Sequence, residues 1–159
     1  MSFDFIHDWD EAARSASFPW FEPVRPAPDL IEGGSRGQGP DGVHQLGVRA
    51  TFPTGSAEIL TSRLDGGVRF TAWRRRRVDA LLGRAVPDDD VALPLTITVE
   101  QADRVIDVDG SPVRFDGEQI RGAGWWVGTA VLDDAAVHIV ADGCAIEALV
   151  RCGPHATRR

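Results

Sequence analysis

The chain has 159 residues, of which 43% are hydrophobic and 26% charged, and its formal net charge is −7. This composition is typical of a globular protein and excludes disorder over the whole length, while the length predicts a single domain over residues 1–159. The sequence contains no lysine, tyrosine or asparagine, which excludes a Walker A loop and a Schiff-base lysine. Because the codons for these three residues are AT-rich, we attribute their absence to a GC-rich bacterial genome.

The acidic balance argues against general binding of nucleic acid, which needs a net basic surface to displace counterions. No apolar run approaches the roughly 20 residues that cross a bilayer, and the acidic N-terminus lacks the positive charge of a secretory signal. We therefore expect a cytoplasmic protein without membrane contact. Cys144 and Cys152 are not expected to bond to each other, because a strand between them would hold them about 26 Å apart.

The N-terminal part is predicted to be a helix followed by an irregular connection. Apolar residues recur at helical spacing within residues 1–18 and form one apolar face, which we expect to dock on the rest of the chain. Residues 19–42 hold five prolines and then a glycine-rich stretch. This composition predicts an extended, proline-stiffened segment that ends in a glycine loop.

From residue 43 the hydrophobic period changes to two, which predicts a β body over residues 43–152. A first antiparallel meander is predicted from three strands, at residues 44–52, 56–63 and 68–75. A short helix is predicted over residues 78–86, before Pro87.

A second meander is predicted to follow, with strands at residues 93–100, 103–108, 113–115, 123–132, 136–141 and 145–151. Asp109-Gly110 and Asp142-Gly143 are typical hairpin turns within it, and the tail 153–159 is expected to fray. The predicted fold is mainly β: about eight antiparallel strands in two meanders that form a sandwich or a barrel. The N-terminal helix and the short helix between the meanders complete it.

Familiar catalytic and cofactor motifs are absent or out of context. Gly37–Gly42 matches G-x-G-x-x-G, but a coil precedes it, a strand follows it and its proline lacks an N–H, so a dinucleotide site is rejected. His7, Asp10 and Glu11 share one helix face, but no further histidine completes a metal site. We therefore nominate no catalytic residue, metal or cofactor, and we lean towards a protein that is not an enzyme.

Several acidic side chains near predicted turns are interpreted as turn residues, where aspartate is common for local reasons. This set comprises Asp107, Asp109, Asp116 and Glu118.

One candidate binding surface combines arginine with tryptophan. Arg69, Trp73 and Arg75 share one face of the predicted 68–75 strand, and Arg49 on a neighbouring strand can extend it. An indole among guanidinium groups suits an anionic or planar partner, including a local contact with nucleic acid. The alternative is that the arginines cover Trp73 and bind nothing.

A second candidate is the strand with adjacent tryptophans. Neighbouring residues of a strand face opposite ways, so Trp125 and Trp126 are predicted on different sides of the sheet, and Gly128 leaves room beside Trp126. Core packing is the first interpretation, and a ligand cavity or subunit interface is the alternative. His138 would face the same pocket as Trp126 and act as a general base there, or it is a hydrogen-bonded or surface histidine.

The leading hypothesis is a non-enzymatic accessory protein that binds another protein, or a second copy of itself, through an exposed sheet face. The alternative is a β-barrel that binds or acts on an apolar small molecule, with Trp126 and His138 lining the cavity.

Overall fold

The computed structural model describes residues 19–36, 45–63, 78–82, 98–132 and 135–152. Within these ranges the chain forms ten strands and one short helix at residues 78–82, so the prediction of a mainly β protein is confirmed. The expected N-terminal helix and the expected strand at 68–75 lie outside the described residues. The strands are β1 (Trp20–Arg25), β2 (Leu30–Arg36), β3 (Gln45–Phe52), β4 (Gly55–Arg63), β5 (Thr98–Gln101), β6 (Arg104–Val108), β7 (Ser111–Arg121), β8 (Trp125–Leu132), β9 (Ala135–Asp142) and β10 (Ala148–Cys152).

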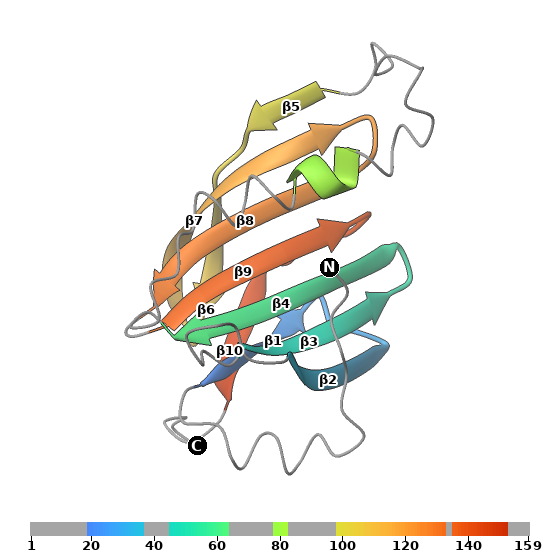
Figure 1. Cartoon of the computed structure of the whole chain (residues 1–159). Coiled ribbons are helices and arrows are strands. Elements are labelled where there is room, and N and C mark those ends of the chain that lie inside the picture. Colours follow the sequence, from blue (N-terminus) through green and yellow to red (C-terminus); the bar gives the residue numbers. More distant parts are fainter. Residues whose placement is uncertain (1–18, 37–44, 64–77, 83–97, 133–134, 153–159) are drawn as a thin grey trace.

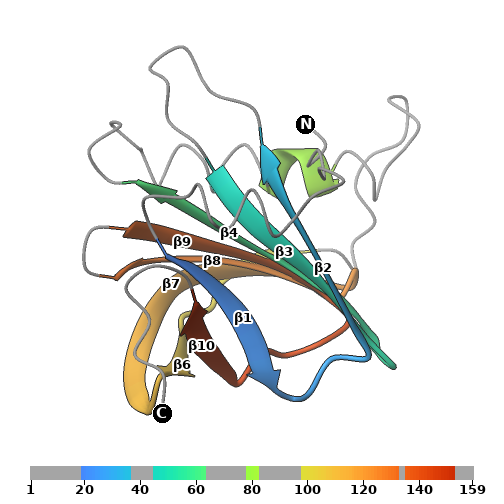
Figure 2. The same cartoon turned by 90° about the horizontal axis from the view of Figure 1, so that it is seen from below.

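The strands form one curled sheet in the order β1-β10-β6-β7-β8-β9-β4-β3-β2, with β5 beside β7 (Figure 1). β10 pairs with β6 in parallel, whereas the other described pairs are antiparallel. β7 bends and carries the sheet around, so that β1, β10 and β6 lie across the concave side from β3, β4 and β8 (Figure 2). The result is a half-barrel of mixed strands, where an antiparallel sandwich or a closed barrel was predicted.

The segment predicted to be an irregular connection contains two strands, β1 and β2. Both are terminal strands of the sheet, which is where proline and glycine are tolerated because one edge of the backbone needs no ladder partner. Pro23 lies opposite Leu149, and the register shifts just after it. The prediction of an irregular connection is therefore wrong for these residues, because a proline- and glycine-containing segment can form an edge strand.

The two predicted meanders merge into one sheet, because β9 pairs with β4. Asp109-Gly110 forms the predicted hairpin, with positive φ at both residues and Val108 opposite Ser111. The prediction that Asp142-Gly143 starts another hairpin is wrong. The chain instead crosses to β10, between β1 and β6, and a Cβ on Gly143 would lie 2.5 Å from the Thr54 carbonyl oxygen.

Apolar side chains cover both faces of the central strands. The concave side holds the main core, whose largest fully buried side chains include Trp126, Phe21 and Phe115. On the outer face, Val78 and Leu81 of the short helix belong to a second cluster with Leu60, Ile120 and Val127. β8 is thus covered on both sides over most of its length, which agrees with core packing as the first interpretation of this strand.

Candidate functional site

The most unusual stretch of the sheet is a break in one edge of β7. The first half of this edge pairs with β6 and the second half with β5, which leaves Asp116 and Gly117 between them. There the Ala102 N–H donates to the Gly117 carbonyl at 2.9 Å, and the Gly117 N–H donates to Asp103 Oδ1 at 3.2 Å. The carboxylate of Asp103 thus takes over one backbone hydrogen bond that a continuous strand would supply.

The other contacts of Asp103 hold its carboxylate firmly. Oδ2 accepts from Arg114 Nε at 3.0 Å and also from Arg114 Nη2, while Oδ1 additionally accepts from Gln101 Nε2 at 2.5 Å. Arg114 first, then Gln101 and the Gly117 N–H, hold the pKa of Asp103 well below its usual range. Asp103 is therefore ionised at physiological pH and serves as an acceptor, not as a general acid.

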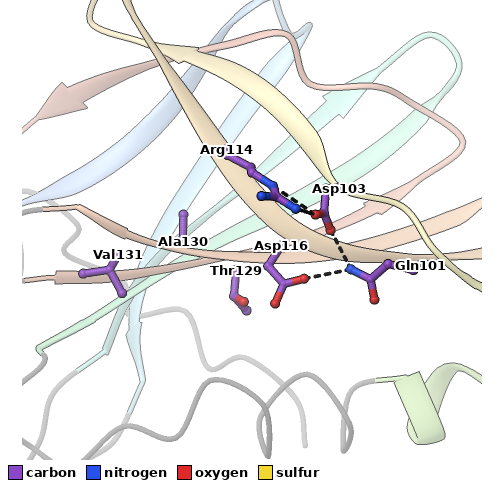
Figure 3. Close-up of a pocket in the computed structure, with 7 residues that line it drawn as sticks. All are labelled: Gln101, Asp103, Arg114, Asp116, Thr129, Ala130 and Val131. Carbon is purple, nitrogen blue, oxygen red and sulfur yellow. Dashed lines mark hydrogen bonds and ion pairs between the residues drawn. The ribbon is translucent and has the colours of Figure 1, made fainter.

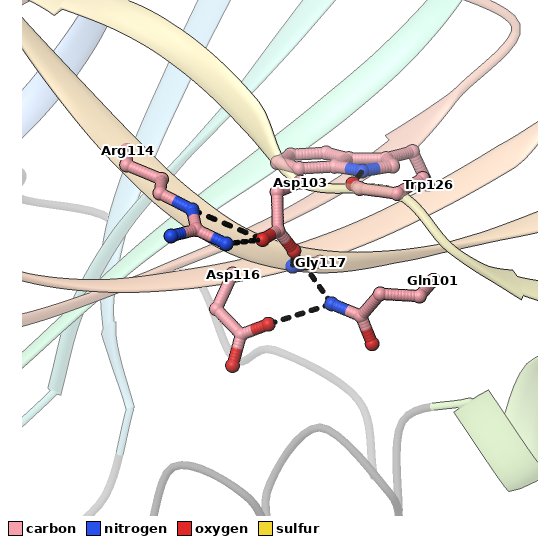
Figure 4. A network of polar contacts seen from close by, with 7 residues as sticks. Gln101, Asp103, Arg114, Asp116, Gly117 and Trp126 are labelled. Carbon is pink, nitrogen blue, oxygen red and sulfur yellow. Dashed lines mark hydrogen bonds and ion pairs between the residues drawn. The ribbon is translucent and has the colours of Figure 1, made fainter.

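Gln101 joins Asp103 to a second carboxylate. Its Nε2 also donates to Asp116 Oδ1 at 2.8 Å. Because ionised carboxylates only accept hydrogen bonds, the amide nitrogen must face both of them, and Oε1 points away (Figure 4). Among the described residues neither Gln101 Oε1 nor Arg114 Nη1 has a hydrogen-bond partner.

These polar groups line an open groove with a volume of about 670 Å³ (Figure 3). Phe115 and Gly117 of β7 face the core, so the alternating Arg114 and Asp116 project from the outer face of the sheet. The side chain of Arg114 is 76% exposed. The groove is lined by Gln101, Asp103, Arg114, Asp116, Thr129, Ala130 and Val131.

Exposed apolar side chains flank the polar groups. Val131, in the groove, is 51% exposed, and Val105, which pairs with Arg114 across β6 and β7, is 67% exposed. These two valines add exposed apolar surface beside the fixed polar groups.

The described lining of the groove consists of one hydroxyl-bearing side chain, charged and amide groups, and apolar side chains. Thr129 is its single hydroxyl-bearing side chain, and it is buried. Within the part of the chain that the structure describes, no group of three or more His, Cys, Asp or Glu side chains could hold a metal ion. What the groove offers instead is hydrogen-bonding groups whose orientation is already set.

Trp126 lies in the main core and is 2% exposed. Its indole N–H donates to the Ala102 carbonyl at 2.7 Å, and the guanidinium of Arg104 lies 4.6 Å from the ring centroid. The ring lies over Gly117 and Gly128, where an added Cβ would overlap it. The room that glycine leaves beside Trp126 is therefore occupied by the indole itself.

His138 is fully buried, but it does not face Trp126. The register places His138 opposite Thr129 and Leu60, whereas Trp126 lies opposite Ala141 in the main core. The two side chains are on different faces of the sheet. Along β9, His138 is three positions from Ala141, the residue opposite Trp126, so the two side chains face opposite ways. The expectation that they line one cavity is therefore wrong.

The predicted arginine–tryptophan face is described only in part. Arg49 lies on β3, 40% exposed, and its Nη2 is 3.0 Å from Glu58 Oε1 on β4. Arg69, Trp73 and Arg75 lie outside the described residues, so this surface stays a prediction.

Gln101, Asp103 and Arg114 were not predicted as site residues, and Asp116 was predicted to be a turn residue. Asp107 does accept a hydrogen bond from the Gly110 N–H in the hairpin, at 3.1 Å. Asp116, by contrast, lies in the middle of β7. The alternation of charged residues from 114 to 118 was the available signal, whereas nothing local connects Gln101 with residues thirteen to fifteen positions later.

No family model, curated protein or solved structure matches the chain. Among the described residues, no helix is long and apolar enough to cross a membrane.

Proposed function

We propose that this chain is a non-enzymatic binding protein whose partner is another protein, and that the partner docks on the outer face of the sheet at the groove around Arg114. The observation that carries the proposal is a pair of oriented, exposed polar groups, Arg114 Nη1 and Gln101 Oε1, beside the exposed Val131. Orientation in advance lowers the entropy that is lost on binding.

The core on the concave side favours this function over the binding of an apolar small molecule within a barrel. A barrel of eight strands can enclose one small ligand when its interior is left open. Here Phe21, Phe115 and Trp126 fill the concave side and are at most 2% exposed. The described polar groove lies on the opposite face.

Site-specific photo-crosslinking tests the proposal. A benzophenone amino acid replaces Val131 in the groove, or Val24 as the control; Val24 is 49% exposed on β1, with two strands between β1 and β7. In a lysate of the source cells, we expect a crosslinked protein from position 131 that position 24 does not capture. The adduct should disappear with Arg114→Ala.

The matched control for Arg114→Ala is Arg121→Ala. Arg121 is also an exposed arginine on β7 and also contacts a carboxylate, Glu100, at 3.1 Å, but it does not line the groove. Two outcomes contradict the proposal. One is that positions 131 and 24 capture the same proteins, and the other is that Arg114→Ala leaves the adduct at position 131 unchanged.

A further inference from the structure

We propose that β2 is the contact between two copies of this chain, which pair their β2 strands antiparallel across a twofold axis at Gly33. The sheet then continues from one copy into the other. This edge has three strands between it and β8, which carries part of the groove, so the proposal is independent of the proposed function.

The outer edge of β2 presents backbone groups that a further strand can pair. The Thr51 carbonyl on β3 accepts from the Asp29 N–H at 2.8 Å, so Thr51 faces β2, where its partner is Leu30. Because successive residues of a strand turn their backbone groups to opposite edges, the residues that face away from β3 alternate with Leu30. They are Ile31, Gly33 and Ser35. In the described part of the chain no strand pairs with this edge.

The other described edges of the sheet are protected against pairing, whereas β2 is not. β1 contains Pro23, after which its register shifts, and β5 has four residues. Proline, irregular register and short length are ordinary ways in which proteins block an edge strand. β2 has seven residues and no proline, and two of its apolar side chains are well exposed, Leu30 at 53% and Ile31 at 38%.

A second copy of β2 fits this edge because the strand is self-complementary. In an antiparallel pair centred on Gly33, Ile31 lies opposite Ser35 of the second copy, and Gly33 lies opposite Gly33 of the second copy. The outward-facing residues of one copy therefore meet the outward-facing residues of the other. Each such pair can exchange both of its N–H···O hydrogen bonds, so the backbone of the whole strand is paired.

The charges of β2 favour the same register. Its charged residues are Glu32 and Arg36, which have opposite signs. With the axis at Gly33, Glu32 lies opposite Gly34 of the second copy, and its diagonal neighbour on the same face is Arg36 of that copy. Opposite charges at such positions attract, whereas an axis at Glu32 would place two glutamates directly opposite each other, which is destabilising.

Sedimentation velocity of the full chain over a wide range of concentration tests the association. The variant Gly33→Pro tests the edge, because proline removes the outward N–H of residue 33 without removing a hydrogen bond to β3. We expect a concentration-dependent dimer of the unmodified chain. The variant should associate about tenfold or more weakly, because the twofold axis doubles the loss to two hydrogen bonds. Its circular dichroism spectrum and its crosslink at position 131 should not change.

Disulfide trapping tests the register. The Cα atoms of a directly opposite, hydrogen-bonded pair are about 5.5 Å apart, which a disulfide can bridge, so Gly33→Cys should join two copies under mild oxidation. The matched control is Leu30→Cys, because position 30 is exposed on the same strand but its two copies would lie about 20 Å apart. Mass spectrometry of the unreduced dimer identifies the joined positions and separates this disulfide from any that involves Cys144 or Cys152.

Three outcomes overturn the proposal. The first is sedimentation as a monomer at every concentration, and the second is a dimer that a folded Gly33→Pro variant leaves unchanged. The third is trapping that is as fast with Leu30→Cys as with Gly33→Cys. If Gly33→Pro does not fold, the two cysteine variants decide: trapping at position 33 alone supports the twofold pair, and equal trapping or none contradicts it.

Discussion

The two faces of the sheet around β7 and β8 each use one arginine, in opposite ways. On the concave side, Arg104 stacks on Trp126, its Nη1 is buried without a hydrogen-bond partner in the described part of the chain, and burial lowers its pKa. On the outer face, Arg114 is exposed and held by Asp103, which raises its pKa. Packing orients the first guanidinium, and hydrogen bonds orient the second.

On the proposed function, this difference separates the residues that stabilise the fold from those that bind a partner. The concave face is filled by large side chains, so changes there should mainly alter the free energy of unfolding. The groove is open and polar, so changes there should mainly alter binding. Asp103 connects the two faces, because it completes the backbone pairing of Gly117 beneath Trp126 and also orients Arg114.

The largest expected effect is that of Trp126→Ala. Removing the indole leaves a cavity over Gly117 and Gly128 and takes away the hydrogen bond to Ala102, so we expect a loss of about 3–5 kcal/mol in the free energy of unfolding. Urea denaturation of the purified variant measures it. A loss below about 1 kcal/mol would show that the concave face is not the centre of stability.

Gly128→Ala should have the next largest effect, because the new Cβ would overlap the Trp126 ring. We expect a loss of about 1–3 kcal/mol, which is typical of overpacking. The matched experiment is a double-mutant cycle with Trp126→Leu, measured by urea denaturation. The cost of Gly128→Ala should shrink in the Trp126→Leu background; an equal cost in both backgrounds would mean that the strand, not the ring, rejects the methyl group.

Asp103→Asn should reveal how the contacts of the carboxylate depend on pH. The pKa of Asp103 is lowered in the folded chain, so its ionisation stabilises the fold at pH values above the unfolded-state pKa of about 3.9. This contribution declines as the pH falls below about 4 and is lost once the pH passes the folded-state pKa. The difference in urea midpoint between unmodified chain and variant should therefore be present at pH 7 and smaller at pH 3, whereas a difference independent of pH would contradict this.

The smallest expected effect is that of Arg104→Met. The variant loses a cation–π contact with Trp126 worth about 0.5–2 kcal/mol, but it also removes a partly desolvated charge that has a buried, unpaired Nη1. These terms offset each other, so we expect a change within about 1 kcal/mol by urea denaturation. The Arg114-dependent crosslink at position 131 should not change. An altered crosslink in this variant would contradict the separation between the two faces.

Local patterns predicted those parts of the fold in which neighbours in sequence are also neighbours in the sheet. Alternating apolar residues marked β3 and β4, and Asp109-Gly110 marked the hairpin from β6 to β7. Apolar residues on both sides of Trp125–Leu132 correctly indicated a strand covered on both faces. In each case the information lies within about ten residues, the range over which strand and turn preferences act.

The candidate site was largely beyond such patterns. Gln101 ends β5, Asp103 lies between β5 and β6, and Arg114 belongs to β7; they meet because β5 and β6 share one edge of β7. Trp126 was singled out from the sequence as a candidate binding residue, yet it is buried, and its stacking against Arg104 depends on the curl of the sheet. Contacts between side chains across the break in the edge of β7 leave no periodic pattern in the sequence, so they could not be predicted from it.

The sequence by itself determined a mainly β chain, its central strands and one tight hairpin, because local periodicity and turn preferences act through short stretches of backbone. The tertiary structure decided that β1 and β2 are edge strands, that β10 crosses into a parallel pair, and that His138 and Trp126 lie on opposite faces. The tertiary structure also determined which residues line the groove. These features depend on register and on which strands become neighbours, and both follow from packing across the whole sheet.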